Sequence, residues 1–483
     1  MSLFLWLLIT LPLLMGLWAI LLKKRNWIFS YMLTNTVVYW ILTIGSIFFL
    51  RNELFHGYSV SLWNLVFINQ INAIFIVLIL SLSFVIGMYA LHYFKEEIAK
   101  KEIGYSRLKE YPILINMFIF SMIFTALSNN LVVTWIGLEA TTIFTTFLIS
   151  FYNTETSREA AWKYIIICSV WLTVGLFGMF LMLYSGLPSL TISEIIRTGI
   201  DMSTVNISLL QFSFLFIVIG FWTKAALFPM NTWLPDAHGK APSPVSAFMS
   251  SILLPLALYV IFRVKEILDI AIPGFANQIL LVFGIITLVF SGIILIKQKH
   301  FKRALAYSSS EHMGVIAIAF ALNMPLIAFA HIIFHSFIKS AAFMSAGDVL
   351  LKMGSGQFDK IRNLFKYMKF TPILLIISLV FLMWIPPSYL FVTEIALIVK
   401  SFAYSPWISI IITLAILLAT SGLLINFGKM FKGEEKESYE PIHELSRDDA
   451  DFHRNGSHRA IAISLAFPII LTIIASIWFW RIW

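Results

Sequence analysis

Charged residues interrupt the apolar stretches of this sequence at a few positions, where they could carry ions. Glu139 lies in the middle of the segment TWIGLEATTIF, Lys224 follows a long apolar run, and Glu394 follows Pro386–Pro387. A charge at the centre of a membrane helix costs about 2.5–3.5 kcal/mol on insertion. We therefore interpret these three residues as functional, with Lys163 or Lys224 as the base that pairs with Glu139.

A row of imidazoles precedes a lysine in AHIIFHSFIKSAAF. His331, His335 and Lys339 recur every four residues, so they share one face of a helix. Two histidines at this spacing can bind a metal ion, but no HExxH signature is present and no cysteine is near. We interpret the row as a proton relay, because imidazole both accepts and donates protons near neutral pH. Buried structural histidines are the alternative.

Other ionisable residues have two interpretations. His312 follows Glu311 in RALAYSSSEHMG, so their side chains point about 100° apart. His312 is the better candidate, and Glu311 fits an interfacial position. Lys163 lies at the start of a predicted span. A lysine at such a position either takes part in ion transport or extends its ammonium group to the membrane interface. Near predicted interfaces, where a solvated structural role fits equally well, lie Asp236, His238, Lys240 and Asp348.

Signatures of other chemistry are absent from the sequence. It contains no GxxxxGK[ST] for phosphate, no GxGxxG and no GxSxG. The single cysteine, Cys168, excludes a disulfide framework and leaves no thiolates for an iron–sulfur cluster or a zinc site. We predict no cofactor, no bound metal ion and no catalytic redox centre in this chain, so any redox chemistry belongs to partners.

The composition is that of a protein that crosses a membrane many times. Hydrophobic residues make up 59% of the 483 and charged residues only 12%. We expect the first apolar segment to be a span rather than a removable signal, since no small-residue cleavage site follows it. Fourteen segments can each cross roughly 30 Å of hydrocarbon. They are residues 2–22, 27–50, 67–93, 112–129, 131–152, 162–186, 209–228, 242–263, 276–296, 304–322, 325–351, 371–400, 406–428 and 460–480.

The loop charges predict the orientation. Lysine and arginine gather in the loops that follow odd-numbered spans. The positive-inside rule then puts these loops in the cytoplasm and both termini outside a multi-pass protein of the cell membrane. The net charge of +9 follows from this topology, with some attraction to membrane lipid, and requires no nucleic acid. The longest polar loop, residues 429–459, is predicted to be a cytoplasmic contact for a partner.

Prolines predict two broken helices. Pro229 and Pro235 interrupt span 7, and Pro386–Pro387 interrupts span 12. Paired broken helices are typical of transporters with inverted repeats. Spans 4–8 and 9–13 would each contain five helices, and because five is odd the second copy would be inverted. From the prolines alone, a repeat and a coincidence are equally consistent.

These segments resemble the antiporter-like proton-translocating subunits shared by respiratory complex I, Mrp-type cation/proton antiporters and membrane-bound group 4 hydrogenases. The resemblance covers nearly the whole chain and is most specific in WTKAALFPMNTWLPDAHGKAPSPVSA, KRALAYSSSEHMG and HSFIKSAAF. The first segment is most similar to hydrogenase-4 component F and its relatives.

The resemblance implies an all-α polytopic membrane fold of about fourteen helices, with two inverted five-helix repeats and broken helices 7 and 12. The domains would be helices 1–3 in residues 1–110, the first repeat in 111–265, the second in 266–430, and a cytoplasmic loop with helix 14 in 431–483.

The family's functional charges fall on residues of this chain. The corresponding positions, from span 5 to span 12, are Glu139, Lys224, His312, His331, His335, Lys339 and Glu394. Lys163 and His238 complete the predicted proton path. Many relatives carry a bridging lysine in span 8, where SILLPLALY has Pro255 instead. A bridge here would need water, His238, His312 or a hydroxyl.

We therefore predict a subunit that translocates protons, or exchanges sodium for protons, in a redox-driven complex such as a group 4 hydrogenase or a complex I-like oxidoreductase. Its partners would be other membrane subunits and a peripheral redox arm. Two alternatives stay open. One is a Mrp-type antiporter subunit without a redox arm, and the other is a structural anchor that no longer pumps, which Pro255 favours.

Overall fold

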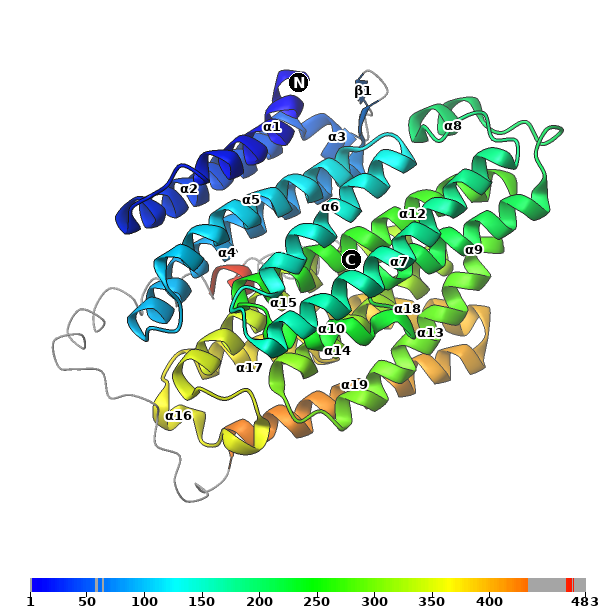
Figure 1. The fold of residues 1–483 in the computed structure, drawn as a ribbon. Helices are drawn as coiled ribbons and strands as arrows, with labels where there is room; N and C mark the ends of the chain where they lie inside the picture. The colour runs from blue at the N-terminus through cyan, green and yellow to red at the C-terminus, as the bar shows by residue number, and fades with distance from the viewer. Residues whose placement is uncertain (1, 57–59, 63–64, 433–465, 471, 473–483) are drawn as a thin grey trace.

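Long helices lie roughly side by side and form the body of the protein (Figure 1). The computed structural model describes residues 2–56, 60–62, 65–432, 466–470 and 472. The N-terminal elements are α1 (Ser2–Ala19), α2 (Arg25–Phe49), α3 (Arg51–His56), the strands β1 (Val60–Leu62) and β2 (Val66–Ile68), α4 (Gln70–Ala99) and α5 (Tyr105–Leu127). The two strands pair as a short antiparallel hairpin.

The rest of the chain is helical between its loops. The middle elements are α6 (Leu131–Ile149), α7 (Glu155–Tyr184), α8 (Ile192–Thr198), α9 (Ile207–Lys224), η1 (Met230–Trp233), α10 (Leu234–Lys240), α11 (Ser243–Phe248), the π-helical turn η2 (Met249–Leu253) and α12 (Leu254–Ala271). The last are α13 (Phe275–Ile296), α14 (Phe301–Ala321), α15 (Pro325–Met353), η3 (Phe358–Lys360), α16 (Leu364–Tyr367), α17 (Thr371–Leu382), α18 (Tyr389–Tyr404) and α19 (Pro406–Phe431).

The helices confirm a polytopic, all-α membrane fold. Within the described residues, ten helices are long and apolar enough to cross a membrane, and α17 and most of α1 are shorter apolar helices. The first thirteen predicted spans coincide with a helix or with a broken helix pair. The fourteenth span, 460–480, and the loop 429–459 lie outside the described residues, apart from 429–432, 466–470 and 472.

Some helices extend beyond the predicted spans. α7 begins at Glu155 rather than at 162, because Thr154 caps it by accepting a hydrogen bond from the Ser157 amide. α5 begins at Tyr105 rather than at 112, and α12 continues to Ala271 rather than to 263. A span predicted from hydropathy stops at the first charged residues, whereas the hydrogen-bonded helix continues past them.

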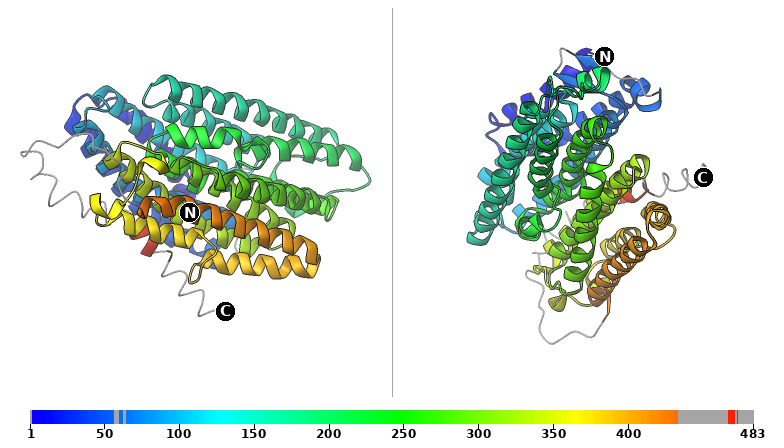
Figure 2. Two further views of the ribbon diagram at one scale, coloured as in Figure 1. Left: turned by 90° about the horizontal axis from the view of Figure 1, so that it is seen from below. Right: turned by 90° about the vertical axis from the view of Figure 1, so that its right-hand side faces the viewer.

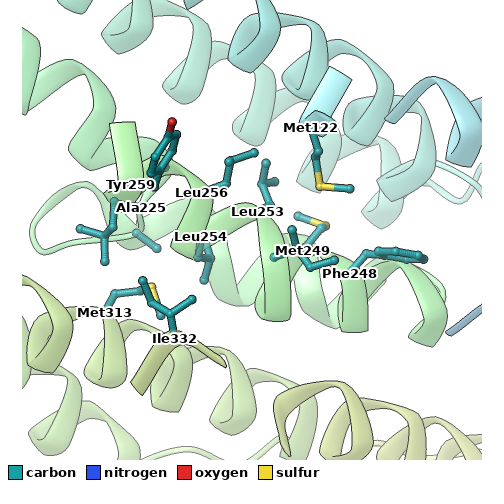
Figure 3. Packing of buried hydrophobic residues seen from close by; sticks show 14 of the residues in the cluster. Met122, Ala225, Phe248, Met249, Leu253, Leu254, Leu256, Tyr259, Met313 and Ile332 are labelled. Carbon is teal, nitrogen blue, oxygen red and sulfur yellow. The ribbon is translucent and has the colours of Figure 1, made fainter. Parts of the chain in front are cut away.

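The run from α11 through η2 to α12 is the centre of the bundle. Its most apolar window is entirely buried, which holds for no other span among the described residues. Helices α5, α14 and α15 surround it (Figure 3). The labelled contact residues include Met122, Met249, Leu253, Leu254, Met313 and Ile332.

Outer helices carry apolar side chains on their surface. On α7, Trp162, Ile166 and Val170 are 65%, 56% and 56% exposed and follow at four-residue steps. A long exposed apolar stripe of this kind requires lipid or a partner helix. Figure 2 shows α1 and α2 (blue) and α19 (orange) on opposite sides of the central green helices.

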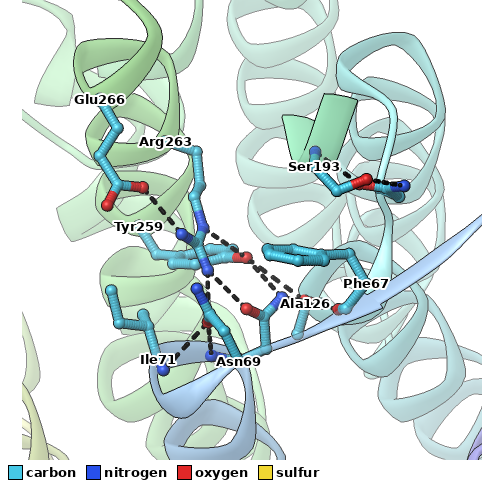
Figure 4. Close-up of polar contacts among 10 residues, drawn as sticks. Phe67, Asn69, Ile71, Ala126, Ser193, Tyr259, Arg263 and Glu266 are labelled. Carbon is cyan, nitrogen blue, oxygen red and sulfur yellow. Dashed lines mark hydrogen bonds and ion pairs between the residues drawn. The ribbon is translucent and has the colours of Figure 1, made fainter. Parts of the chain in front are cut away.

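A buried arginine ties α12 to the start of α4 (Figure 4). Arg263 is 1% exposed, and its Nη2 donates to Asn69 Oδ1 at 2.7 Å and to Asn72 Oδ1 at 2.5 Å. Its Nη1 pairs with Glu266 at 2.7 Å, and its Nε donates to the Tyr259 hydroxyl at 3.2 Å. Because the Arg263 guanidinium is buried, leaving it without these partners would be strongly destabilising. The cluster thus anchors the central helix at one end.

Both predicted helix breaks are present. α9 ends at Lys224 and α10 starts at Leu234, while α17 ends at Leu382 and α18 starts at Tyr389. The division of the chain into two inverted repeats stays a prediction.

Side chains satisfy backbone groups that the breaks leave free. At the first break, Trp233 Nε1 donates to the Thr223 carbonyl at 2.9 Å. At the second, Ser388 Oγ donates to the Phe381 carbonyl at 2.7 Å. Non-helical backbone at membrane depth is tolerated where protein or water supplies such partners. The breaks are therefore built features of the fold.

Candidate functional site

Lys224 lies fully buried at the broken end of α9. Its Nζ donates to Thr142 Oγ1 of α6 at 2.9 Å and to the Tyr164 hydroxyl of α7. Tyr164 in turn shares a 2.5 Å hydrogen bond with Thr145 Oγ1. The ammonium group therefore has hydroxyl partners from two other helices, and no carboxylate of the described residues forms an ion pair with it.

Glu139 lies one helical turn before Thr142 on α6. Its Oε1 accepts a 2.5 Å hydrogen bond from Ser169 Oγ of α7, and its buried Oε2 has no hydrogen-bond partner. Neither Lys224 nor Lys163 forms an ion pair with it in the part of the chain that is described. The expected Glu139–Lys224 ion pair is absent from the described contacts, and Lys224 donates to Thr142 and Tyr164 instead.

Lys163 is near the surface rather than in the buried path. Its Nζ pairs with Glu159 at 2.6 Å and with Asp236 of α10 at 3.5 Å, and its side chain is 48% exposed. Asp236 also pairs with Arg303 of α14 at 3.3 Å. Since α7 begins at Glu155, Lys163 lies two turns inside the helix rather than at its start. Its place in an ion path stays a prediction.

The second break brings imidazoles and a carboxyl group together. His312 Nδ1 lies 3.1 Å from His331 Nε2 and 3.7 Å from Glu394 Oε1. His331 Nδ1 lies 2.8 Å from Thr393 Oγ1, one residue before Glu394 on α18. All are buried. Three helices, α14, α15 and α18, thus bring groups that can exchange protons close together. The two imidazoles are within hydrogen-bond distance of each other, and the Glu394 carboxyl group lies just beyond that distance from His312.

Lys339 continues the row on α15 and is also fully buried. Its Nζ donates to Ser308 Oγ at 2.7 Å and to the Leu305 carbonyl at 3.1 Å, both on α14. His335 lies between Lys339 and His331 in the row, and its ring centroid is 5.2 Å from that of His312. Neither of its ring nitrogens forms a hydrogen bond with a described residue.

Glu311 is not interfacial, so that expectation was wrong. It is 4% exposed, and its Oε2 lies 3.5 Å from His312 Nε2. α14 begins at Phe301, which moves Glu311 to the middle of the helix. His312 therefore has a carboxyl group on each side, Glu311 at Nε2 and Glu394 at Nδ1. Sequence reasoning named Glu311 but preferred His312, although both residues lie well inside the predicted span 304–322.

His238 is buried, not solvated at an interface. Its ring stacks on Phe343 of α15 with centroids 4.9 Å apart. Both ring nitrogens are buried and have no hydrogen-bond partner among residues 2–56, 60–62, 65–432, 466–470 and 472. Because neutral imidazole needs one donor and one acceptor partner, this pattern indicates water at the ring.

Serine hydroxyls of α14 lie between the regions of Lys224 and Lys339. Ser310 Oγ donates to the Ala226 carbonyl, beside the first break, at 2.7 Å. Ser309 Oγ shares a 2.7 Å hydrogen bond with Ser250 Oγ of η2. Ser308 accepts a hydrogen bond from Lys339. Residues 308–310 therefore form a serine triplet that contacts both the first helix break and Lys339. Sequence reasoning missed it as a group, although YSSSEHMG shows the triplet.

Pro255, at the position where the resemblance predicts a bridging lysine, follows the π-helical turn η2. The structure offers hydroxyls at this level, which is one of the bridges considered from the sequence. A π-helical turn inside an α-helix is frequent at functional sites.

One group of side chains could also hold a cation. Single ligand atoms of His312, His331 and Glu394 all lie within 4.8 Å of one another. The two imidazoles are hydrogen-bonded directly to each other, however, which favours a shared proton over a bound ion.

Comparisons with known proteins bear on this site. The family model described as NADH:quinone oxidoreductase/Mrp antiporter, TM, matches residues 128–419. A hydrogenase-4 component F homolog of Methylacidiphilum infernorum is 30% identical over 422 residues, which cover 85% of this chain and 87% of that relative. NADH-quinone oxidoreductase subunit L of Neisseria meningitidis is 25% identical over 438 residues, and the match spans only 62% of its length.

A solved structure shares the fold. A chain of the membrane-bound sulfane sulfur reductase, an archaeal respiratory membrane complex, superposes with a TM-score of 0.83 at 21% identity. The superposition covers 99% of this chain and 95% of that chain. The matched residues include both broken helices and every element of the buried site.

Proposed function

Because this chain belongs to the NADH:quinone oxidoreductase/Mrp antiporter membrane family, we propose that it translocates protons as an antiporter-like subunit of a redox-driven membrane complex. The chain itself supplies the proton path. The partners supply the redox reaction, as the names of its relatives indicate for their own complexes.

One observation carries the proposal. Two lysines, Lys224 and Lys339, are fully buried, and both are bound by hydroxyl or carbonyl oxygens rather than by carboxylates. A buried ammonium without a counter-charge is unfavourable, so its proton is easily displaced when a nearby charge moves. A structural anchor gains nothing from such residues, whereas a proton carrier requires them.

The groups connect across the protein. In order, the proposed path runs through Lys224, the serine triplet, Lys339, His335, His331, His312 and Glu394. Glu139 is the charge that modulates Lys224, through movement of the Ser169 contact. Each transfer between groups further apart than a hydrogen bond passes through water.

The ion exchanged and the driving partner are separate parts of the proposal. The family description includes Mrp antiporters, so exchange of sodium for protons is the second candidate. The clustered basic loops support a cytoplasmic position for the ends of α4, α13 and α15. Both termini would then lie on the other side of the membrane.

The test uses the whole complex in liposomes, with internal pH and sodium followed separately while its redox reaction runs. We expect Lys224→Met and Lys339→Met each to lower ion movement by about tenfold or more, because the carrier is lost while a similar shape remains. Lys400→Met, at an exposed lysine of α18, is the matched control. Native ion movement in both buried-lysine variants would refute the proposal, and sodium movement without redox turnover would favour the antiporter.

A further inference from the structure

A second group of buried polar residues lies outside this path, where α4, α11 and α15 pack against one another. Its two carboxyl groups are Glu97 of α4 and Asp348 of α15, which are 4% and 5% exposed. We call the group the access cluster. Its members are Tyr89, Glu97, His238, Ser243, Ser345 and Asp348.

Hydroxyl groups satisfy one oxygen of each carboxyl group. Glu97 Oε1 accepts from the Tyr152 hydroxyl, which lies 2.9 Å from the hydroxyl of Tyr93. Asp348 Oδ2 accepts from Thr371 Oγ1 at 3.4 Å. The cluster therefore brings side chains from several helices to one place, as a built polar site does.

Several other polar atoms of the cluster form no hydrogen bond within the described part of the chain. They are Glu97 Oε2, Ser345 Oγ and both ring nitrogens of His238, all of them buried. Leaving a buried polar group unpaired is unfavourable, and such groups are rare in native proteins. Buried water molecules usually supply the missing bonds, with two to four polar partners each. Several orphan atoms in one region thus indicate several waters.

The cluster reaches Lys339 along one face of α15. Lys339, Phe343 and Gly347 follow at four-residue steps, so they share that face. Phe343 stacks on His238, and a Cβ at Gly347 would lie 2.4 Å from the Tyr89 hydroxyl and 2.4 Å from Ser243 Cβ. The absent side chain at Gly347 therefore lets α15 approach both α4 and α11.

The other end of the cluster reaches the side of the basic loops. Lys100, after the last residue of α4, donates through Nζ to the Leu351 carbonyl near the end of α15. Lys100 is half-buried, and Lys352 is exposed. Asp348 lies one turn before Lys352 on α15. Between this surface and Lys339, buried polar groups recur at Asp348, Ser243 and His238.

We infer that a file of water molecules occupies the access cluster and connects the basic-loop side of the membrane with His238 and Lys339. Its use by protons rests on the proposed function, whereas its hydration does not. Glu97 and Asp348 are positioning residues that hold the water and favour a passing cation.

Accessibility of new cysteines tests the hydration. Ser345→Cys and Ser243→Cys are introduced into the full complex, which is exposed to Ag⁺, an ion narrow enough for a file of water. Unreacted thiols are then alkylated after denaturation and counted by mass spectrometry. We expect both cysteines to be protected by Ag⁺ at least about tenfold faster than the control, because thiolates react where water reaches them.

The control is Ser121→Cys on α5, a fully buried serine whose hydroxyl donates to the Phe118 carbonyl. The native Cys168, buried in α7, is counted in every sample. Rapid protection of either cluster cysteine supports the inference. Protection no faster than at position 121 overturns it, even if the complex pumps normally.

A second measurement tests the use by protons. We expect the double variant Glu97→Gln/Asp348→Asn to slow proton movement by about fivefold or more, with a smaller change in redox turnover. Asp359→Asn, at an aspartate whose side chain is 68% exposed, is the control. A native rate in the double variant overturns the proton route. Because Lys224→Met tests pumping independently, failure here is distinguishable from failure of the proposed function.

Discussion

At the break after α9 the charged group is an ammonium bound by hydroxyls, whereas at the break between α17 and α18 it is a carboxyl group beside imidazoles. Lys224 donates to the hydroxyl groups of Thr142 and Tyr164. No carboxyl or imidazole group of the described residues bonds to it. Glu394 faces His312 at 3.7 Å. A helix break thus separates Lys224 from other proton-exchanging groups at one site, whereas at the other site it places Glu394 beside a row of imidazoles.

This difference suggests separate tasks. A carrier that is isolated from other bases holds its proton until a neighbouring charge moves, while a carboxyl group next to hydrogen-bonded imidazoles exchanges protons readily. We propose that the first break stores a proton and that the second releases it. The variants below test this contrast.

The largest effect is expected at the second break. Glu394→Gln removes the group that receives the proton, so proton movement in liposomes should fall by about tenfold or more. Glu394→Asp keeps the carboxyl group on a shorter side chain and should retain a measurable part of the rate. Equal rates for Gln, Asp and the native chain would contradict the release role.

A smaller effect is expected at the partners of the first lysine. Thr142→Val keeps the shape but removes one of two hydroxyl partners of Lys224, so proton movement should slow by about three- to tenfold. Thr146→Val is the matched control, because the Thr146 hydroxyl donates to a carbonyl of its own helix. If the two variants slow the complex equally, the Thr142 contact has no special role.

A moderate loss of stability is expected at the cap of α18. Ser388 Oγ accepts from the Leu390 amide, and losing such a cap costs about 1 kcal/mol. The thermal midpoint of Ser388→Ala in the purified complex should therefore lie below that of Ser401→Ala, whose hydroxyl donates to the Ile398 carbonyl in mid-helix. Identical midpoints would show that the break does not depend on this cap.

The smallest effect is expected at Lys163. Its pairs with Glu159 and Asp236 are exposed to solvent, so Lys163→Gln should change proton movement by less than about twofold. The liposome assay used for Lys224→Met measures this directly. A loss as large as that of Lys224→Met would return Lys163 to the path.

Much of the architecture was predictable because it depends on local sequence. Apolar length predicted the spans, and proline predicted both breaks within a few residues. The four-residue spacing of His331, His335 and Lys339 predicted a common helix face, and the structure places them on α15 facing α14 and α18.

Other features depended on helix ends that hydropathy does not locate. α12 continues past Arg263, where the predicted span 242–263 ended, and this residue is buried. Glu311 looked interfacial because it is charged, but it lies in the middle of α14 and is buried. Arg263 stays inside partly because Asn69 and Asn72, at the start of α4, accept its hydrogen bonds, and such distant partners cannot be identified from the local sequence.

The sequence by itself determined the apolar spans and where the helices break, since both follow from residue type and period. Only the tertiary structure decided which groups touch. It paired Lys224 with Thr142 and Tyr164 instead of Glu139, and it set His312 between two carboxyl groups. Such contacts join residues far apart in the chain, so they depend on how whole helices pack rather than on any local pattern.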